Sequence, residues 1–232
     1  MTDFLFDPPA VPGIPVAGER ALYPVGRIFC VGRNYAAHAA EMGVEVDRDA
    51  PFYFTKSPSA CLESGSVLPY PPGTEDLHHE MELALAIGAP TFRASADAAA
   101  AAVHAYGCAL DMTRRDLQKA AKETRRPWDL GKDFEGSAVF GPLTRAAEMA
   151  PLGPQRIRLE VNGETRQDAT LDQLIHPVPA LVAHLSHFYH LRPGDLILTG
   201  TPAGVGAVGP GDRLSGSIEG LAPVTLEIGA PA

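Results

Sequence analysis

The chain has 232 residues, of which 45% are hydrophobic and 20% are charged, and its formal net charge is -9 at pH 7. This length can bury one substantial core, so we expect one main domain. The negative charge argues against a dedicated nucleic-acid-binding protein, which usually carries a basic face. The three cysteines, Cys30, Cys61 and Cys108, are too few and too scattered for a disulfide framework or a cysteine-rich zinc site.

The amino terminus lacks the basic and long apolar segments of a signal peptide, and no stretch reaches the length of a transmembrane helix. We therefore expect a cytoplasmic protein with no membrane partner. Residues 1–26 are rich in proline and show little periodicity. We interpret them as an N-terminal arm or small appended segment that precedes a catalytic domain over residues 27–232.

Along this main domain, apolar runs and alternating patterns predict mostly strands. Strands are expected at residues 27–32, 51–57, 80–88, 106–113, 193–202 and 211–229, and a hairpin is expected over residues 156–170 with its turn at Asn162-Gly163. Helices are expected at residues 34–43, from Ser95 or Asp97 onward, at residues 114–126 and after Pro177. Residues 65–76 are rich in turn residues. Because strands dominate and no long βαβ rhythm is present, we predict a β-rich α+β fold.

The segment DLHHEMELALAIG, residues 76–88, places Glu80 and Glu82 two positions apart in an apolar run. Alternate residues of a strand share a face, so both carboxylates would lie opposite Met81 and Leu83. Two neighbouring negative charges repel each other, and burial raises that cost unless a positive charge compensates. A strand face exposed to water fits the same spacing.

Asp111 ends another apolar strand. Together with Glu80 and Glu82 it would form a site of oxygen ligands, which suits Mg²⁺, Mn²⁺ or Ca²⁺ and leaves positions for water or substrate. A zinc site that includes His78 or His79 is the alternative, although catalytic zinc prefers several nitrogen ligands and no H-E-x-x-H sequence is present.

His38 and Glu41 lie three residues apart in a predicted helix, so their side chains can touch on one face. A carboxylate beside an imidazole orients the ring and raises its basicity, which is a common way to activate water. A contact on the protein surface fits the same spacing.

Two further motifs are interpreted without a ligand. GVGAVG, residues 204–209, matches the glycine pattern of dinucleotide-binding loops, but Pro210-Gly211-Asp212 follows as a turn where such a loop needs a helix N-terminus. The basic stretch KAAKETRR, residues 119–126, is expected to form a solvated helix face.

Several stretches together resemble the fumarylacetoacetate hydrolase family. They are VGRNYAAHAAEMG, PFYFTKSPSA, HHEMELALAIG, GCALDMTRRDLQ, PWDLGKDFEGSAVFGP and GDLILTGTPAGVG, and they follow the order of that family over nearly all of the main domain. The resemblance implies a mixed β-sandwich roll and usually a homodimer. It also implies a divalent ion, usually Mg²⁺ or Mn²⁺, held by Glu80, Glu82 and Asp111.

Carried over residue by residue, the resemblance implies further roles. His38 and Glu41 match a segment that orders into a lid on ligand binding, and Lys132 matches a lysine near the metal; these three are the implied catalytic residues. Arg115 and Gln118 match side chains that grip the substrate. The full set of implied substrate-binding residues is Arg33, Lys56, Arg115, Gln118 and Thr201, the last of which would bind the pyruvoyl carboxylate.

The family acts on β-dicarbonyl or 2-keto acids, in which the 2-oxo oxygen and the carboxylate can chelate one metal ion. That ion would stabilise the pyruvate enolate released when a C–C bond breaks. His38, oriented by Glu41, would activate water, and Lys132 would offset the excess negative charge. The chain resembles the compact acylpyruvate and fumarylpyruvate hydrolases, including those of gentisate degradation. The expected reaction is hydrolysis of fumarylpyruvate, or of another acylpyruvate, to pyruvate and an acid.

Relatives in this family decarboxylate or tautomerise oxaloacetate, or isomerise hydroxylated dienoic keto acids, with the same metal site, and these reactions are the alternatives. A non-catalytic binding member is expected to have lost a ligand or a residue of the His–Glu pair, whereas this chain has all of them. A dianionic substrate needs a cation at its far end, and Arg33, Arg125 and Arg126 are the candidates.

Overall fold

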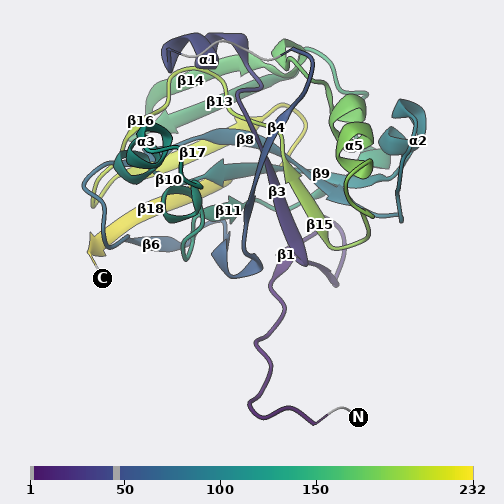
Figure 1. Cartoon of the computed structure of the whole chain (residues 1–232), viewed down its shortest axis with the longest axis horizontal. Coiled ribbons are helices and arrows are strands. Elements are labelled where there is room, and N and C mark those ends of the chain that lie inside the picture. Colours follow the sequence, from purple (N-terminus) through teal and green to yellow (C-terminus); the bar gives the residue numbers. More distant parts are fainter. Residues whose placement is uncertain (1–2, 44–47, 232) are drawn as a thin grey trace.

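The alternating segment that carries the glutamates forms a central strand of the larger of two main sheets (Figure 1). The computed structural model describes residues 3–43 and 48–231. In spatial order the larger sheet contains β4 (Phe52–Lys56), β3 (Arg27–Gly32), β15 (Asp195–Leu198), β8 (Met81–Ile87), β9 (Val103–Asp111), β11 (Ala138–Phe140) and β5 (Cys61–Glu63), and β12 (Thr144–Arg145) pairs with β9.

The remaining strands form a second main sheet and two small sheets. The second main sheet contains β14 (Glu164–Thr170), β13 (Arg156–Val161), β17 (Arg213–Ile218), β18 (Val224–Pro231) and β6 (Val67–Tyr70). A three-stranded sheet contains β10 (Thr113–Arg114), β7 (Leu77–His79) and β16 (Gly206–Ala207), and β1 (Gly13–Pro15) pairs with β2 (Leu22–Pro24).

The two main sheets pack face to face because each directs a face of large apolar side chains at the other. Leu83 and Leu85 of β8 share one buried cluster with Leu159 of β13 and Leu226 of β18. The opposite face of β8 carries Glu82 and two alanines that belong to a second cluster. The predicted β-rich α+β sandwich is therefore confirmed, and so is the separation of the carboxylate face from the large apolar side chains.

The helices lie around the sheets. They are α1 (Ala36–Glu41), α2 (Ala96–Ala101), α3 (Arg115–Glu123), α4 (Asp129–Lys132) and α5 (Val178–Ser186), with short 3₁₀ turns at Pro58–Ala60, Ala146–Glu148 and Leu171–Gln173. Of the two candidate caps, Ser95 and Asp97, it is Ser95 that caps α2, by accepting a hydrogen bond from the backbone N–H of Ala98. No helix within the described ranges is long and apolar enough to cross a membrane.

Two interpretations made from turn residues have different outcomes. The segment 65–76, which is rich in turn residues, also contains a strand, because residues 67–70 form β6, which pairs in parallel with β18. That pairing depends on a strand far away in the sequence. The GVGAVG segment forms β16, followed by a turn rather than a helix, so it offers no dinucleotide site.

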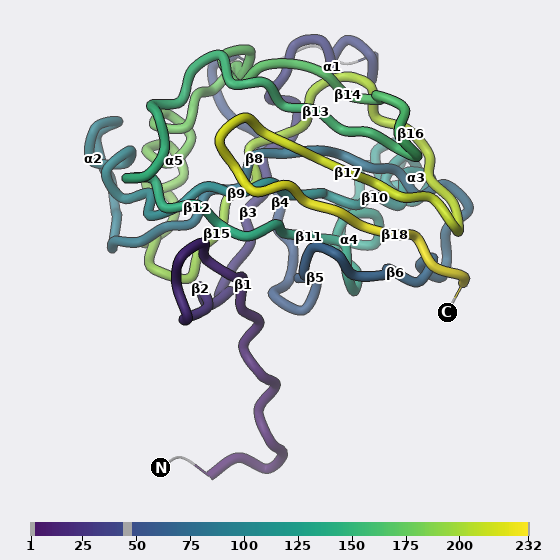
Figure 2. The backbone as a smooth tube through the Cα atoms, turned by 180° about the vertical axis from the view of Figure 1, so that it is seen from behind, coloured from purple at the N-terminus to yellow at the C-terminus, as the bar shows by residue number. Residues whose placement is uncertain are grey.

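The amino-terminal segment divides into two parts. Residues 3–12 extend away from the sheets in both views (Figures 1 and 2). The β1–β2 hairpin instead packs against the larger sheet, and its Ile14 and Tyr23 share a buried cluster with Ile28 and Leu196. The hairpin therefore buries its apolar residues in a core that it shares with the main domain.

The hydroxyl of Tyr23 joins this hairpin to two central strands. It lies 2.8 Å from the carbonyl oxygen of Ile87 and 2.9 Å from that of Asp195, and it accepts a 2.8 Å hydrogen bond from the N–H of Gly194. Tyr23→Phe leaves these buried backbone groups without their partner. We expect the free energy of unfolding to fall by about 1–3 kcal/mol, measured by urea denaturation.

Tyr35→Phe is the matched control for this measurement. The hydroxyl of Tyr35 is buried and has no hydrogen-bond partner among the described residues. Removing it is expected to leave the stability unchanged or slightly higher. Equal losses in the two variants would contradict the role assigned to the Tyr23 hydroxyl.

Candidate active site

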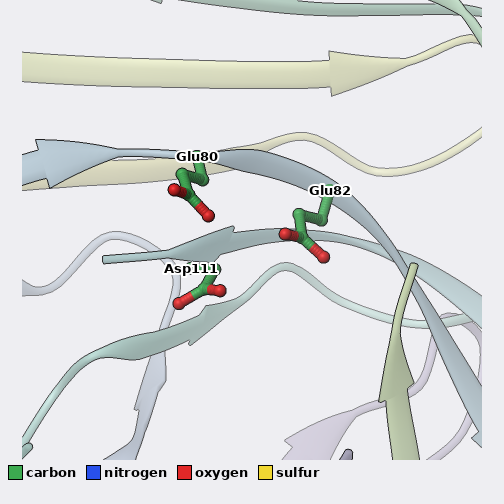
Figure 3. Close-up of side chains that lie close together, drawn as sticks. All are labelled: Glu80, Glu82 and Asp111. Atoms are coloured by element: carbon green, nitrogen blue, oxygen red, sulfur yellow. The ribbon is translucent and has the colours of Figure 1, made fainter. Parts of the chain in front are cut away.

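Three carboxylates from adjacent antiparallel strands converge at one point (Figure 3). Glu80 lies between β7 and β8, Glu82 lies in β8, and Asp111 is the last residue of β9. The N–H of Asp111 donates a 2.8 Å hydrogen bond to the carbonyl oxygen of Glu80, which fixes the register of the two strands. One oxygen from each of the three carboxylates lies within 4.8 Å of the others. All three residues are at most 5% exposed, so the alternative of a solvated strand face is wrong.

Glu80 is held as an anion by two cations. Lys132 Nζ lies 2.7 Å from Glu80 Oε2, and an Arg115 guanidinium nitrogen lies 2.5 Å from Glu80 Oε1. Burial raises the pKa of a carboxyl group, but the positive charges of Lys132 and Arg115 outweigh this effect and lower the pKa of Glu80 well below its usual range.

Glu82 has no such cation partner among the described residues. It accepts a 2.7 Å hydrogen bond from the N–H of Gly200. Burial, together with the negative charges of Asp111 and Glu80, raises the pKa of Glu82 well above its usual range. A divalent ion would supply the missing positive charge, and carboxylate oxygens are ligands that hard divalent ions prefer. The three carboxylates therefore fit a metal site.

Asp111 lies between two buried lysines. Lys132 Nζ is 2.8 Å from Asp111 Oδ2, and Lys56 Nζ is 2.8 Å from Asp111 Oδ1. Lys132 also donates a 2.8 Å hydrogen bond to Thr113, so its three ammonium hydrogens are directed at Glu80, Asp111 and Thr113. Lys132 thus orients two of the three carboxylates and balances their charge.

The predicted His–Glu pair is formed on α1. His38 Nδ1 lies 3.2 Å from Glu41 Oε2, and His38 is buried with 8% of its surface exposed. Glu41 also accepts hydrogen bonds of 3.2 Å from the N–H of Gly204. Gly204 has a φ of +94°, and a Cβ there would lie 2.0 Å from the carbonyl oxygen of Arg166, so this position requires glycine. The contact joins a buried histidine to an exposed glutamate, so it lies at the edge of the protein surface rather than wholly on it.

A small pocket brings His38 together with Glu80 and Glu82, whereas Glu41 and Asp111 do not line it. It has a volume of about 30 Å³, and among its lining residues are His38, Glu80, Glu82, Arg33, Arg115, Gln118, Lys132 and Thr201. Gln118 accepts a 2.7 Å hydrogen bond from Arg115. The structure thus brings most of the sequence-predicted site residues to one cavity.

Lys56 does not line this pocket. Its ammonium group is fully buried behind Asp111 and hydrogen bonds to the carbonyl oxygens of Met112 and Lys132 and to Ser137 Oγ. In this position Lys56 is suited to orient Asp111 rather than to contact substrate. A substrate-binding role of Lys56 therefore receives no support from the geometry.

His78 and His79 lie beside the site and outside the carboxylate group. His78 Nε2 lies 2.9 Å from Asp76 Oδ1, and His79 Nδ1 lies 3.3 Å from Gln167 Oε1. Burial lowers the pKa of His79 to about 4, so its ring is neutral near pH 7. The structure gives no support to the alternative of a zinc site that uses either histidine.

Sequence reasoning missed Gln167, which is fully buried on β14. Its Nε2 donates 2.8 Å hydrogen bonds to Thr201 Oγ1 and to the carbonyl oxygen of Pro202, and its Oε1 accepts one from the N–H of Met81. Gln167 therefore fixes Thr201 at the pocket wall. A glutamine in an exposed-looking hairpin strand carries no local signal of this role.

Comparison with known proteins agrees with this geometry. The family model described as "Fumarylacetoacetate (FAA) hydrolase C-terminal" matches residues 27–228. The chain belongs to the fumarylacetoacetate hydrolase family. The match spans all of the pocket residues named above.

Individual relatives in this family include hydrolases and tautomerases. The chain is 49% identical over 190 residues to a fumarylpyruvate hydrolase from Ralstonia sp, which covers 81% of this chain and 98% of the relative. It is 40% identical over 200 residues to oxaloacetate tautomerase YcgM from Escherichia coli, covering 85% and 90% of the two chains. Among solved structures, fumarylpyruvate hydrolase from Pseudomonas aeruginosa in complex with Mn²⁺ and pyruvate superposes with a TM-score of 0.95 at 44% identity, covering 98% of this chain and 100% of that chain.

Proposed function

We propose that this protein hydrolyses an acylpyruvate at a C–C bond, with fumarylpyruvate as the substrate and fumarate and pyruvate as the products. The observation that carries the proposal is that His38, which contacts Glu41, lines the same pocket as Glu80 and Glu82, the two glutamates that are grouped with Asp111. Hydrolysis needs both an activated water and stabilisation of an enolate. The similarity to the Ralstonia fumarylpyruvate hydrolase supports this reaction and this substrate.

The residues divide the chemistry between them. Glu41 orients His38 through Nδ1, which leaves Nε2 as the base that takes a proton from water. The water oxygen bonds to the acyl carbon, the bond from that carbon to C3 of pyruvate breaks, and its electron pair remains on the pyruvate enolate. The proton then returns from His38 to C3, which gives pyruvate and the carboxylic acid.

Glu80, Glu82 and Asp111 are proposed to hold Mg²⁺ or Mn²⁺, with Ca²⁺ as a further option for the same oxygen ligands. When bound, the ion supplies Lewis acidity that polarises the keto oxygen and lowers the energy of the enolate. The similar Pseudomonas protein was solved with Mn²⁺ and pyruvate, which supports this choice of ion.

Arg115, Gln118 and Thr201 are proposed to bind the pyruvoyl part of the substrate from the pocket wall. Among the described residues, the buried cations Lys56, Lys132 and Arg115 equal the three carboxylates in number, although they pair only with Glu80 and Asp111. A bound divalent ion therefore leaves the pocket with excess positive charge, which favours an anionic keto acid.

Tautomerisation or decarboxylation of oxaloacetate is the second candidate function. The 40% identity to the Escherichia coli oxaloacetate tautomerase favours it. These reactions use an enolate but need no water to attack a carbonyl group. The His38–Glu41 pair, placed to activate water, favours hydrolysis over them.

Identification of products tests the proposal. Protein stripped with EDTA is expected to lose at least 90% of its activity, and Mg²⁺ or Mn²⁺ is expected to restore it, because the enolate loses its Lewis acid without the ion. The restored enzyme is then given fumarylpyruvate, acetylpyruvate or oxaloacetate in separate reactions followed by NMR. Fumarate and pyruvate should form in equal amounts from fumarylpyruvate. Turnover of oxaloacetate alone, or full activity in stripped protein, would contradict the proposal.

We also propose that the protein acts as a homodimer in the cytoplasm, as the family resemblance implies. The resemblance further implies that the segment containing α1 closes over bound ligand. Light scattering during size-exclusion chromatography is expected to give twice the chain mass of 24.5 kDa.

A further inference from the structure

A second cavity opens beside the pocket that holds the carboxylates. Its volume is about 830 Å³, and it shares Arg33, Phe54, Lys122, Trp128 and Lys132 with the smaller pocket. A substrate bound at the carboxylates could therefore extend past these shared residues toward the larger space. The shared residues therefore form the boundary between the two cavities.

An aromatic pair positions two cations at this boundary. The rings of Phe52 and Trp128 have centroids 4.8 Å apart. Lys122 Nζ lies 4.9 Å from the centre of the Trp128 ring, and Arg33 Cζ lies 5.6 Å from the centre of the Phe52 ring. Both cations are half-buried, and neither forms an ion pair with a carboxylate in residues 3–43 and 48–231. Partly buried charge without an opposite charge is costly, and an anion would relieve it.

Two further features set these cations apart from ordinary surface residues. Burial, together with the positive charge of Arg115, lowers the pKa of Lys122 to about 8 despite the opposing effect of Glu80. Arg33 has a φ of +60°, a left-handed backbone conformation that costs energy for a residue other than glycine or asparagine. The chain thus retains an arginine side chain at a position where glycine would fit the backbone better.

We propose that Lys122 and Arg33 bind the distal carboxylate of a dicarboxylic acylpyruvate and set the preference for such substrates. This inference rests on the proposed function and goes beyond it by assigning the specificity to two residues. Arg125 and Arg126 line only the larger cavity and are exposed, so they lie at its outer edge. The sequence suggested these arginines as equal candidates, and the structure favours the inner pair.

The test compares fumarylpyruvate with acetylpyruvate, which lacks the distal carboxylate. Wild type is expected to prefer fumarylpyruvate in kcat/KM. Lys122→Gln is expected to reduce this preference by roughly 10- to 100-fold, the size expected for a lost hydrogen bond to a charged group, and to leave kcat/KM for acetylpyruvate within about twofold. Arg33→Asn should act in the same direction, because asparagine tolerates the left-handed backbone.

Lys119→Gln is the matched control, because Lys119 is exposed on the same helix and lines neither cavity. This substitution should leave kcat/KM unchanged for both substrates. A second readout uses inhibition by fumarate and by crotonate, which has one carboxylate fewer. Fumarate should inhibit wild type more strongly than crotonate, and Lys122→Gln should remove the difference. Circular dichroism of each variant checks that it is folded.

The outcomes separate this inference from the proposed function. If wild type cleaves neither acylpyruvate, the proposed function fails and this inference falls with it. Only the inference is overturned if wild type cleaves both substrates without preference. The same holds if Lys122→Gln and Arg33→Asn lower kcat/KM equally for fumarylpyruvate and acetylpyruvate. Loss of the preference in Arg126→Gln but not in Lys122→Gln would likewise overturn it in favour of the outer arginine.

Discussion

Glu82→Gln is expected to abolish metal binding and, at the same time, to raise the melting temperature of the metal-free protein. Glu82 is 1% exposed and has no cation partner among the described residues, so its ionised form is destabilising without a metal. Glutamine has nearly the same shape and can still accept the hydrogen bond from Gly200. A gain of roughly 1–2 kcal/mol would raise Tm by about 2–8 °C for a domain of this size.

The pH dependence follows from the direction of the pKa shift. Because the pKa of Glu82 is raised on folding, the metal-free folded protein keeps a proton that the unfolded chain loses near its ordinary value of 4.5. The wild-type protein therefore loses stability as the pH rises from that value toward the raised pKa. Glu82→Gln lacks this loss, so its advantage in Tm should grow with pH over the same window. An advantage that is independent of pH would contradict this explanation.

Asp111→Asn provides the contrast. It leaves two buried lysines, Lys56 and Lys132, without part of their counter-charge, and breaking a buried ion pair costs about 3–5 kcal/mol. Both variants should lose the stabilisation that the metal gives to wild type, which is about 2.7 kcal/mol when the ion is present at 100 times its Kd. Differential scanning calorimetry with EDTA or with Mn²⁺ measures all of these quantities. Equal destabilisation of the two metal-free variants would show that the charges are not arranged as described.

His38→Gln is expected to lower kcat for hydrolysis by about 10²- to 10⁴-fold, the usual contribution of a general base. His38 is proposed to move a proton rather than to hold the substrate or the metal, so KM and Mn²⁺ binding should change little. Any decarboxylation of oxaloacetate should be affected less, because that reaction requires no attacking water.

Steady-state kinetics and titration with Mn²⁺ measure the effects of this substitution. His187→Gln is the control, because His187 is exposed at the end of α5 and lines neither cavity. A His38→Gln variant that retains kcat within a few-fold would exclude His38 as the base. Parallel losses of hydrolysis and of Mn²⁺ binding would instead indicate that His38 supports the metal site.

Local patterns predicted which candidate side chains share a face, and the family resemblance assigned those side chains to one site. Alternation alone separates Glu80 and Glu82 from the apolar face of their strand, and the three-residue spacing of His38 and Glu41 alone allows their contact. These inferences succeed because strand and helix periodicity fix which neighbouring side chains share a face. The family motifs in the sequence also predicted the sandwich fold and the grouping of Asp111 with the two glutamates. This grouping arises in the structure because β8 pairs with β9.

The distribution of charge around the site was decided by the tertiary structure. Only the packed chain shows that Lys132 and Arg115 neutralise Glu80, while Glu82 has no cation partner in residues 3–43 and 48–231. It also shows that Lys56 lies behind Asp111 rather than in the pocket. The same holds for Lys122, which is half-buried although residues 119–126 were expected to form a solvated helix face. Each of these facts depends on distances between residues far apart in the chain, which no local pattern encodes.

The sequence by itself therefore determined that Glu80 and Glu82 share one face of their strand and that His38 and Glu41 can touch on a helix, because both follow from short-range periodicity. The expectation of oxygen ligands for a metal followed from side-chain type together with the family resemblance. The tertiary structure decided which carboxylate has no cation partner among the described residues, which lysine lies behind Asp111 and which cations border the second cavity. These properties follow from burial and from charge–charge distances, and both arise only when the two sheets and α3 have packed around the same pocket.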